Sequence, residues 1–154
     1  MPLGRQLALT NKAMQHWVDE LLGQHGSSLT TWIVLHHAAA APSPGLSQKE
    51  LAGNMAVGGP ALVRHLDRLE EAGFVRRTRD ANDRRITRIT LTPAGQRHRA
   101  QLQTVMDDHD QAMRATLTAT ELRNLQRALD KLHHYVLAVD PLTGSPRPVS
   151  ARTD

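Results

Sequence analysis

Arginine is the residue type in this chain whose number and spacing most clearly predict a chemistry. Residues 76–88 contain six arginines against two aspartates, and Arg64 precedes them on a segment with helical periodicity. A guanidinium group can donate two hydrogen bonds to the O6 and N7 atoms of guanine, and it is attracted to phosphate oxygens and to narrow minor grooves. The pattern therefore predicts binding to double-stranded DNA, although a solvated charged surface is also compatible with it.

The positive charge is concentrated in the middle of the sequence. The whole chain has a formal net charge of +4. Residues 48–99 hold 11 Lys and Arg against six Asp and Glu, a net of +5, so the remainder of the chain has a net of −1. A localised basic region is the electrostatic signature of a protein that binds a polyanion.

The segments before and around Arg64 are predicted to form a helix-turn-helix. Ser47 and Glu50 have the spacing of a capping box, which starts a short helix. Residues 57–60 form the turn, and the next helix extends to Ala72, where a glycine follows it. This second helix is the candidate recognition helix for the major groove.

Two strands are predicted after the recognition helix, at 74–79 and 86–91. They flank the loop 80–85, which contains Arg84 and Arg85. A hairpin with an arginine-rich tip is a wing that can reach the minor groove beside the recognition helix.

Further helices are predicted on both sides of this unit. Apolar residues repeat with helical spacing over 5–22, and a second helix occupies 29–41. Thr92 starts a long helix that extends to about residue 116. A capping box formed by Thr118 and Glu121 starts the last helix.

The last helix carries a narrow apolar seam. Its members repeat every three or four residues, at Leu122, Leu125, Leu129, Leu132 and Val136. Such a seam is typical of helices that pack between two chains, while packing within one chain accounts for the spacing equally well.

We therefore predict a mainly α fold with a small β-hairpin wing, that is, a winged helix-turn-helix flanked by N- and C-terminal dimerisation helices. The expected parts are an N-terminal dimerisation helix (1–28), a DNA-binding domain (29–92), C-terminal dimerisation helices (93–139) and a disordered tail (140–154), in which periodicity is lost.

Several function classes are not favoured. The absence of cysteine excludes disulfides and cysteine-based zinc sites. No signal peptide and no apolar run of about 20 residues is present, so we expect a cytoplasmic protein without a membrane partner. No nucleotide-binding loop, nucleophile elbow or His-Glu-x-x-His pattern is found, so we expect no enzyme, no cofactor and no metal. A winged-helix module that binds proteins instead of DNA remains the alternative of another class.

Four blocks of the sequence and their spacing resemble the MarR family of bacterial transcription regulators: 46–52, 62–73, 83–85 and 91–95. Within this family the SlyA-like branch is the most similar, in residues 2–4, 32–36 and 60–64. The resemblance covers about residues 2–136. It implies a homodimeric repressor that binds an inverted-repeat operator in double-stranded DNA. It also implies that a small aromatic or phenolic acid releases this repressor from the DNA. A ligand-independent DNA-binding regulator or a counter-silencer is the alternative.

The candidate DNA contacts combine the helix-turn-helix and the wing, and they are Ser47, Gln48, Gly59, Pro60, Ala61, Arg64, Arg76, Thr78, Arg79, Asp83, Arg84 and Arg85. Arg77 is expected to line the wing with them. The resemblance implies that Asp83 braces the wing arginines. Arg68 and Arg88 are interpreted as structural ion pairs, with Asp67 and Glu71 within helical reach of Arg68. Gly58 and Gly59 stand where relatives usually carry larger polar residues.

The resemblance also implies a ligand pocket for an aromatic carboxylate. The matching positions are Gln15, Thr30, Trp32, His36 and Arg64. Trp32 would contact the ring, and His36 with Arg64 would bind the carboxylate. An ordinary core position for Trp32 and His36 is the alternative.

Overall fold

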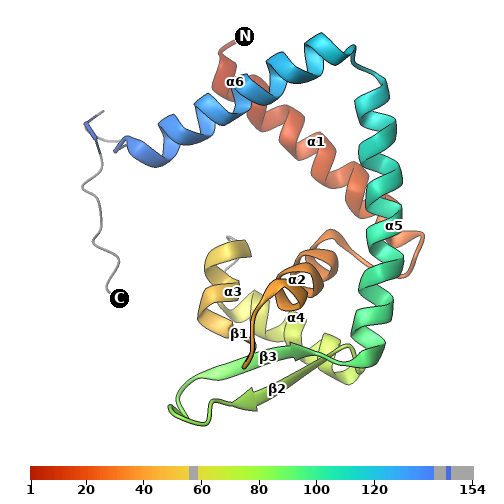
Figure 1. Ribbon diagram of the computed structural model, residues 1–154, viewed down its shortest axis with the longest axis vertical. Coiled ribbons are helices and arrows are strands. Elements are labelled where there is room, and N and C mark those ends of the chain that lie inside the picture. The colour runs from red at the N-terminus through yellow and green to blue at the C-terminus, as the bar shows by residue number, and fades with distance from the viewer. Residues whose placement is uncertain (56–58, 141–144, 147–154) are drawn as a thin grey trace. The chain divides into compact units, whose positions relative to one another are not determined.

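The computed structural model describes residues 1–55, 59–140, 145 and 146. The chain divides into two compact units, Met1–Asp107 and Asp108–Asp154. The first unit holds the described strands and the helices around them (Figure 1). The predicted mainly α fold with a small β wing is confirmed.

The two N-terminal helices match the predicted segments closely. Helix α1 spans Leu3–Gly23, and α2 spans Leu29–Ala40. Ser28 caps α2, because its Oγ accepts a hydrogen bond from the backbone N–H of Thr31 at 3.1 Å.

The helix-turn-helix consists of α3, Gln48–Met55, and α4, Gly59–Glu71. The capping box is present: the Ser47 N–H donates to the Glu50 carboxylate at 2.8 Å, and the Glu50 N–H donates to the Ser47 Oγ at 3.1 Å. Of the predicted turn, residues 57 and 58 lie outside the described part of the chain. Helix α4 ends before Gly73, whose φ of 73° is a conformation that glycine adopts without strain.

The sheet has three antiparallel strands in the order β1-β3-β2. Strands β2, Val75–Arg79, and β3, Thr87–Leu91, form the predicted hairpin. With the loop 80–86 they are called the wing below. The sequence did not predict β1, Leu46–Ser47, which pairs with β3 and joins the start of α3 to the wing.

The core of the first unit is built from helix faces that close over the sheet. The inner face of α4 supplies Leu62, Leu66 and Leu69, all of which are buried, as the four- and three-residue spacing requires. They belong to one cluster with Val75 of β2 and Ile89 of β3. The burial of this face leaves the opposite face of α4 exposed.

Replacement of Leu66 by alanine is expected to lower the free energy of unfolding by about 3 kcal/mol, because Leu66 is fully buried and its loss leaves a cavity. Urea denaturation at a fixed protein concentration measures the change. Val63→Ala is the control, since Val63 is 37% exposed on the same helix and its change should stay under about 1 kcal/mol. Equal effects for the two variants would contradict the assigned packing.

The C-terminal helices begin as predicted. Helix α5 spans Pro93–Ala115, and the Gly95 N–H donates to the Thr92 Oγ1 at 3.0 Å. Helix α6 spans Ala119–Ala138 and starts at the predicted capping box of Thr118 and Glu121. Among the described helices, none is long and apolar enough to cross a membrane.

The apolar seam of α6 is not covered within the single chain. No residue of α6 is buried, and Leu125, Leu129 and Val136 are 45%, 44% and 62% exposed. Of the predicted disordered tail, the structure describes Asp140, Ser145 and Pro146, and the Asp140 N–H donates to the Ser145 carbonyl at 2.8 Å. The rest of that prediction falls outside the described residues.

Candidate nucleic-acid interface

The exposed face of α4 carries the candidate recognition residues. The helix begins at Gly59, and Pro60, Ala61 and Arg64 are exposed. The Arg64 side chain makes no hydrogen bond or ion pair with any residue that the structure describes. Its guanidinium is therefore available to a base edge or a phosphate.

Arg68 lies one turn further along α4, and it does not form the predicted ion pair. Its Nη2 lies 3.4 Å from the Nδ1 of His65, and no carboxylate pairs with it among the residues described. The predicted partner Asp67 binds Arg77 instead. His65 also lies 3.3 Å from the Thr31 Oγ1, and its pKa is lowered by burial and then by the charge of Arg68. Arg68 is thus a further exposed cation beside Arg64.

Arg77 is used within the fold, which corrects its predicted place on the phosphate-binding surface. Its Nη2 lies 2.6 Å from Asp67 and 2.8 Å from Glu70, and its Nε also donates to Glu70. Its backbone N–H donates to Glu70 at 2.9 Å, and these hydrogen bonds from Arg77 lower the pKa of the Glu70 carboxyl. Two carboxylates of α4 thereby tie the recognition helix to β2.

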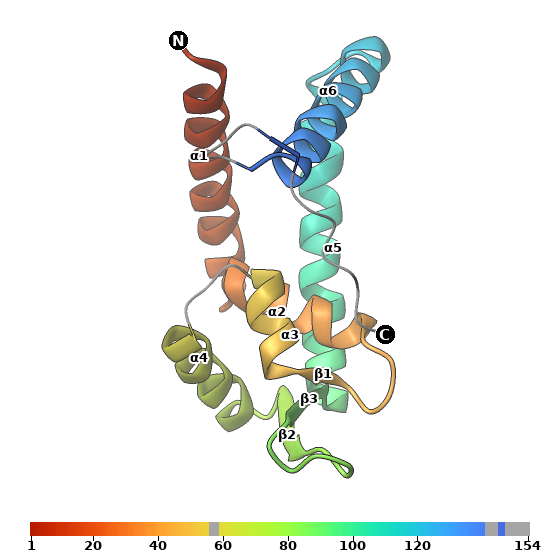
Figure 2. The same ribbon diagram turned by 90° about the vertical axis from the view of Figure 1, so that its left-hand side faces the viewer.

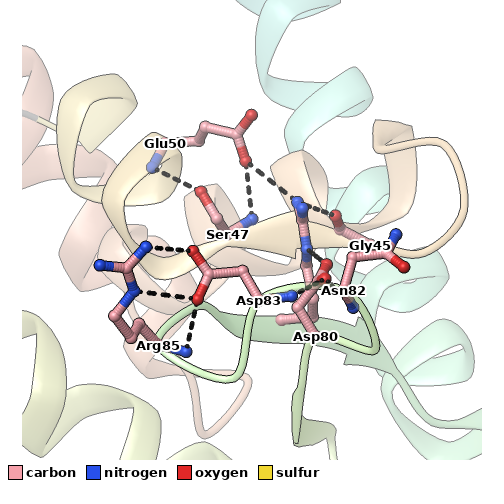
Figure 3. A network of polar contacts seen from close by, with 8 residues as sticks. Gly45, Ser47, Glu50, Asp80, Asn82, Asp83 and Arg85 are labelled. Carbon is pink, nitrogen blue, oxygen red and sulfur yellow. Dashed lines mark hydrogen bonds and ion pairs between the residues drawn. The ribbon is translucent and has the colours of Figure 1, made fainter.

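Asp80 organises the wing from inside (Figure 3). Its side chain is buried, and it accepts hydrogen bonds from the N–H groups of Asn82 at 2.8 Å and Asp83 at 3.0 Å. The Arg88 Nε donates to its other oxygen at 2.7 Å. The hydrogen bond from Arg88, followed by those from the two backbone N–H groups, lowers the Asp80 pKa to about 2. These three hydrogen bonds stabilise this conformation of the loop.

Arg88 connects the wing to the helix-turn-helix. Besides Asp80, its Nη1 donates to the Gly45 carbonyl at 3.3 Å and lies 3.7 Å from the Glu50 carboxylate. Glu50 is also the capping residue of α3. The predicted structural role of Arg88 is confirmed, and the wing and α3 share one polar network (Figure 3).

The two arginines at the tip of the wing differ in their contacts. Arg85 is held by Asp83 through Nε and Nη2, each at 3.1 Å, although its side chain is 91% exposed. Hydrogen bonds from the Arg85 side chain and backbone lower the Asp83 pKa. Arg84 is exposed and has no such partner in the described part of the chain. Asp83 thus orients Arg85 and leaves Arg84 free.

The remaining predicted DNA contacts lie along the strands and at the start of α3. Arg76 and Thr78 are exposed on β2, and Arg79 donates to the Arg84 carbonyl at 3.3 Å and more weakly to Thr87. Gln48 lines a hollow with Arg79 and Thr87, and a second hollow with Arg85.

Near the start of α3, Ser47 has the predicted capping role, and Lys49 is an exposed cation that was not predicted as a contact. Ser47 is buried, and its hydroxyl is used as the helix cap. The sequence interpretation omitted Lys49, which is exposed and lines the same hollow as Gln48 and Arg85. Its position in the first turn of a helix beside the wing is the signal that could have identified it.

The protonation of Asp80 is expected to open the wing only in strong acid. Because folding lowers this pKa, the contribution of the carboxylate to stability is complete above about pH 4 and is lost as the pH falls through about 2. The amide signals of Asn82 and Asp83 in NMR spectra should therefore titrate with a midpoint of about 2. Asp80→Asn should lack this transition. A midpoint near the ordinary aspartate value would contradict the assigned hydrogen bonds.

Among the described hollows, none is lined by all residues of the predicted ligand pocket, which stays a prediction. Gln15 and Thr30 line a hollow together with Ile33 and Met55. Trp32 and His36 lie outside that lining and stack on each other, with ring centroids 5.0 Å apart. Arg64 is exposed on α4 and lies outside the lining too. Trp32 packs against the core cluster, as the alternative interpretation had it.

The winged part of this chain matches the MarR family over residues 28–87. A MarR family protein of Mycobacterium tuberculosis, solved in complex with p-aminosalicylic acid, is 31% identical, and the match covers 86% of this chain and 99% of that protein with a TM-score of 0.68. A mutant MarR of E. coli in complex with operator DNA is 28% identical, with coverages of 86% and 94% and a TM-score of 0.74. The MepR–DNA complex of S. aureus has a TM-score of 0.76 over 86% of this chain and 97% of MepR, and at 22% identity the likeness concerns the fold. The chain therefore belongs to the MarR family of DNA-binding transcription regulators.

Proposed function

We propose that this chain is a homodimeric, sequence-specific regulator that binds an inverted repeat in double-stranded DNA and represses transcription. The observation that carries the proposal is a set of exposed cations on α4 and the wing that have no carboxylate partner among the described residues, namely Arg64, Arg68, Arg76, Arg79 and Arg84. They stand on elements whose positions are fixed by buried leucines and by Asp80. Such preorganised cations can bind phosphates and base edges without further ordering of the loop.

The division of labour follows from the place of each cation. Arg64 lies on the exposed face of the recognition helix, where a guanidinium can bind O6 and N7 of a guanine in the major groove. Arg84 and Arg85 lie at the tip of the wing, which fits the negative potential of a narrow minor groove. Gly59 at the start of α4 adds no side chain, so base recognition there rests on Arg64 and its neighbours.

The homodimer is proposed from apolar surface that the single chain leaves exposed. The seam of α6 and several side chains of α1, including Leu3, Leu7 and Met14, are exposed. On each of these helices the exposed apolar side chains are more numerous than isolated surface positions require, and such apolar surface marks a site of protein association. We assign dimerisation to residues 1–28 and 93–139, and DNA binding to 29–92.

Selection of bound duplexes from a random pool by the full chain tests the proposal. A dimer should enrich an inverted repeat with half-sites about one helical turn apart, and retention should fall steeply with salt. Enrichment of single half-sites would contradict the symmetric dimer. No retention of any duplex in dilute buffer would overturn DNA binding and leave the protein-binding module as the alternative.

Release by a small aromatic or phenolic acid is part of the proposed function. The support is the M. tuberculosis relative, which was solved with p-aminosalicylic acid. Retention of the selected duplex with and without millimolar salicylate tests this part. Unchanged retention would favour a ligand-independent regulator.

A further inference from the structure

A hollow of the first unit lies away from the predicted ligand residues. It has a volume of about 560 Å³ and is bounded by the end of α2, the loop that leads to β1, strand β3 and the first turns of α5. This size is within the range of small-molecule sites. In Figure 2 the loop between α2 and β1 lies beside the lower part of α5.

The walls of this hollow combine apolar and polar surface and contain a single charged side chain. Ala38, Ala39, Ala41, Pro42, Pro44 and Leu91 supply most of the apolar surface. Ser43, Thr90 and Gln96 supply neutral polar groups, and Arg99 supplies the charge. No carboxylate belongs to the lining, so an anion would meet no repulsion from the walls.

Arg99 has no counter-ion within the described residues. Its side chain is half-buried, its Nε is buried without a hydrogen-bond partner, and no described carboxylate pairs with it. A cation in such a place is stabilised by an anion, because the low dielectric of a partly buried site strengthens the attraction. Gln96 lies in the first turn of α5, whose partial positive charge also favours an anion.

We propose that this hollow binds a small organic carboxylate, with Arg99 binding the carboxylate and the alanine, proline and leucine side chains contacting the apolar body. The guanidinium can form two parallel hydrogen bonds with a carboxylate. This site is distinct from the predicted pocket of Gln15, Thr30, Trp32, His36 and Arg64.

The site is placed to influence the wing. The Gly45 carbonyl accepts from Arg88, which in turn binds Asp80, and Gly45 also lines the hollow. Its φ is 108°, and an added Cβ would lie 2.7 Å from the Ile89 carbonyl, so the loop is seated tightly on β3. An occupant that moves this loop would therefore move a partner of Arg88. A regulatory role for this site rests on the proposed release from DNA by a small aromatic or phenolic acid. The occupancy of the site itself is measured without DNA.

Benzoate is the probe, and benzamide is its neutral counterpart. In NMR titrations of the full chain, benzoate should shift the amide signals of Gly45, Thr90 and Leu91 and the Nε–H signal of Arg99 in a saturable way. Benzamide should bind about tenfold more weakly or less, because it lacks the charge-assisted pair.

Arg99→Gln should weaken benzoate binding about tenfold or more. Arg97→Gln is the matched control, since Arg97 is exposed on the same helix and does not line the hollow. Ala39→Phe places a large side chain in the hollow from an exposed position, so it should also weaken benzoate binding. This second variant keeps the proposal testable if Arg99→Gln does not fold. Thermal unfolding identifies that case.

Three results would overturn the site: no saturable shift up to about 50 mM, equal binding by Arg99→Gln and Arg97→Gln, or shifts confined to the surroundings of Gln15 and Thr30. The highest benzoate concentration lies well above the dissociation constant expected of so small a ligand. If benzoate binds in the hollow and the affinity for the duplex is unchanged, the site is upheld and the proposed release of DNA by an aromatic acid is contradicted.

Discussion

The double variant Arg84→Ala with Arg85→Ala is expected to bind every duplex about a hundredfold more weakly than the parent protein near 0.1 M salt. A charge-assisted hydrogen bond contributes about 1.5–3 kcal/mol, so the loss of one such bond at the lower value from each of the two wings of a homodimer amounts to about 3 kcal/mol, which is about a hundredfold. The loss should be similar for specific and non-specific duplexes, because these cations bind phosphates or the minor groove. The dependence of log affinity on log salt should become flatter, by about 0.9 for each phosphate that the variant no longer neutralises.

Fluorescence anisotropy of a labelled duplex at several salt concentrations measures both quantities. The matched control is Arg127→Ala with Lys131→Ala, which removes the same charge from exposed positions of α6. The control should keep the salt dependence of the parent protein. An unchanged affinity and slope in the wing variant would remove the wing from the proposed mechanism, even if the protein still bound DNA through α4.

Local signals in the sequence were sufficient to predict the helices and the β2–β3 hairpin. The capping boxes at Ser47 and Thr118 mark helix starts because a side-chain oxygen and a glutamate satisfy free N–H groups within four residues. The spacing of Leu62, Leu66 and Leu69 identified the buried face of α4, and therefore also the exposed face that carries Arg64. The capping boxes and the leucine spacing both depend on residues that are close in sequence, so they can be recognised from a single sequence.

The roles of individual charged residues could not be predicted in the same way, because their partners are distant in sequence. Arg77 was expected at the phosphate-binding surface, but Asp67 and Glu70 on α4 bind it. Asp80 was not singled out, although it is the buried acceptor that fixes the wing. The six arginines of residues 76–88 cannot be told apart from the sequence alone. Only the tertiary structure distinguishes those that form ion pairs within the fold from those that have no carboxylate partner among the described residues.

Strand β1 and the ligand-binding residues show the same limit. Two residues, Leu46 and Ser47, are too few to display an alternating pattern, and their strand exists because β3 offers an edge to pair with. The predicted ligand residues were carried over from a family pattern. No described hollow is lined by all of them, and the half-buried Arg99, which has no partner among the described residues, carried no signal in the sequence.

Substitution of both Leu125 and Leu129 by glutamate is expected to convert the protein to a monomer and to abolish tight binding to an inverted repeat. A leucine that becomes buried contributes about 1.5–3 kcal/mol, and a homodimer would bury four of these side chains. Because these side chains are 45% and 44% exposed in the single chain, about half of that energy is still to be gained, and their loss alone weakens the dimer by about 3 kcal/mol or more, which is at least a hundredfold in affinity. Each glutamate adds the cost of a charge facing an apolar surface. A monomer binds one half-site, so the gain from linking two half-sites is lost as well.

Sedimentation velocity at about 10 µM chain, a concentration well above the dissociation constant of a stable dimer, measures the assembly state. Anisotropy with one-half-site and two-half-site duplexes measures the consequence for DNA. Asn124→Asp with Gln126→Glu adds the same two negative charges to α6 away from the seam, and this control should remain dimeric. A seam variant that stays dimeric would show that α6 packs through another surface. A parent protein that sediments as a single chain would contradict the homodimer itself. The variant tests the link between assembly and DNA directly, because it leaves Arg64 and the wing of each chain unchanged.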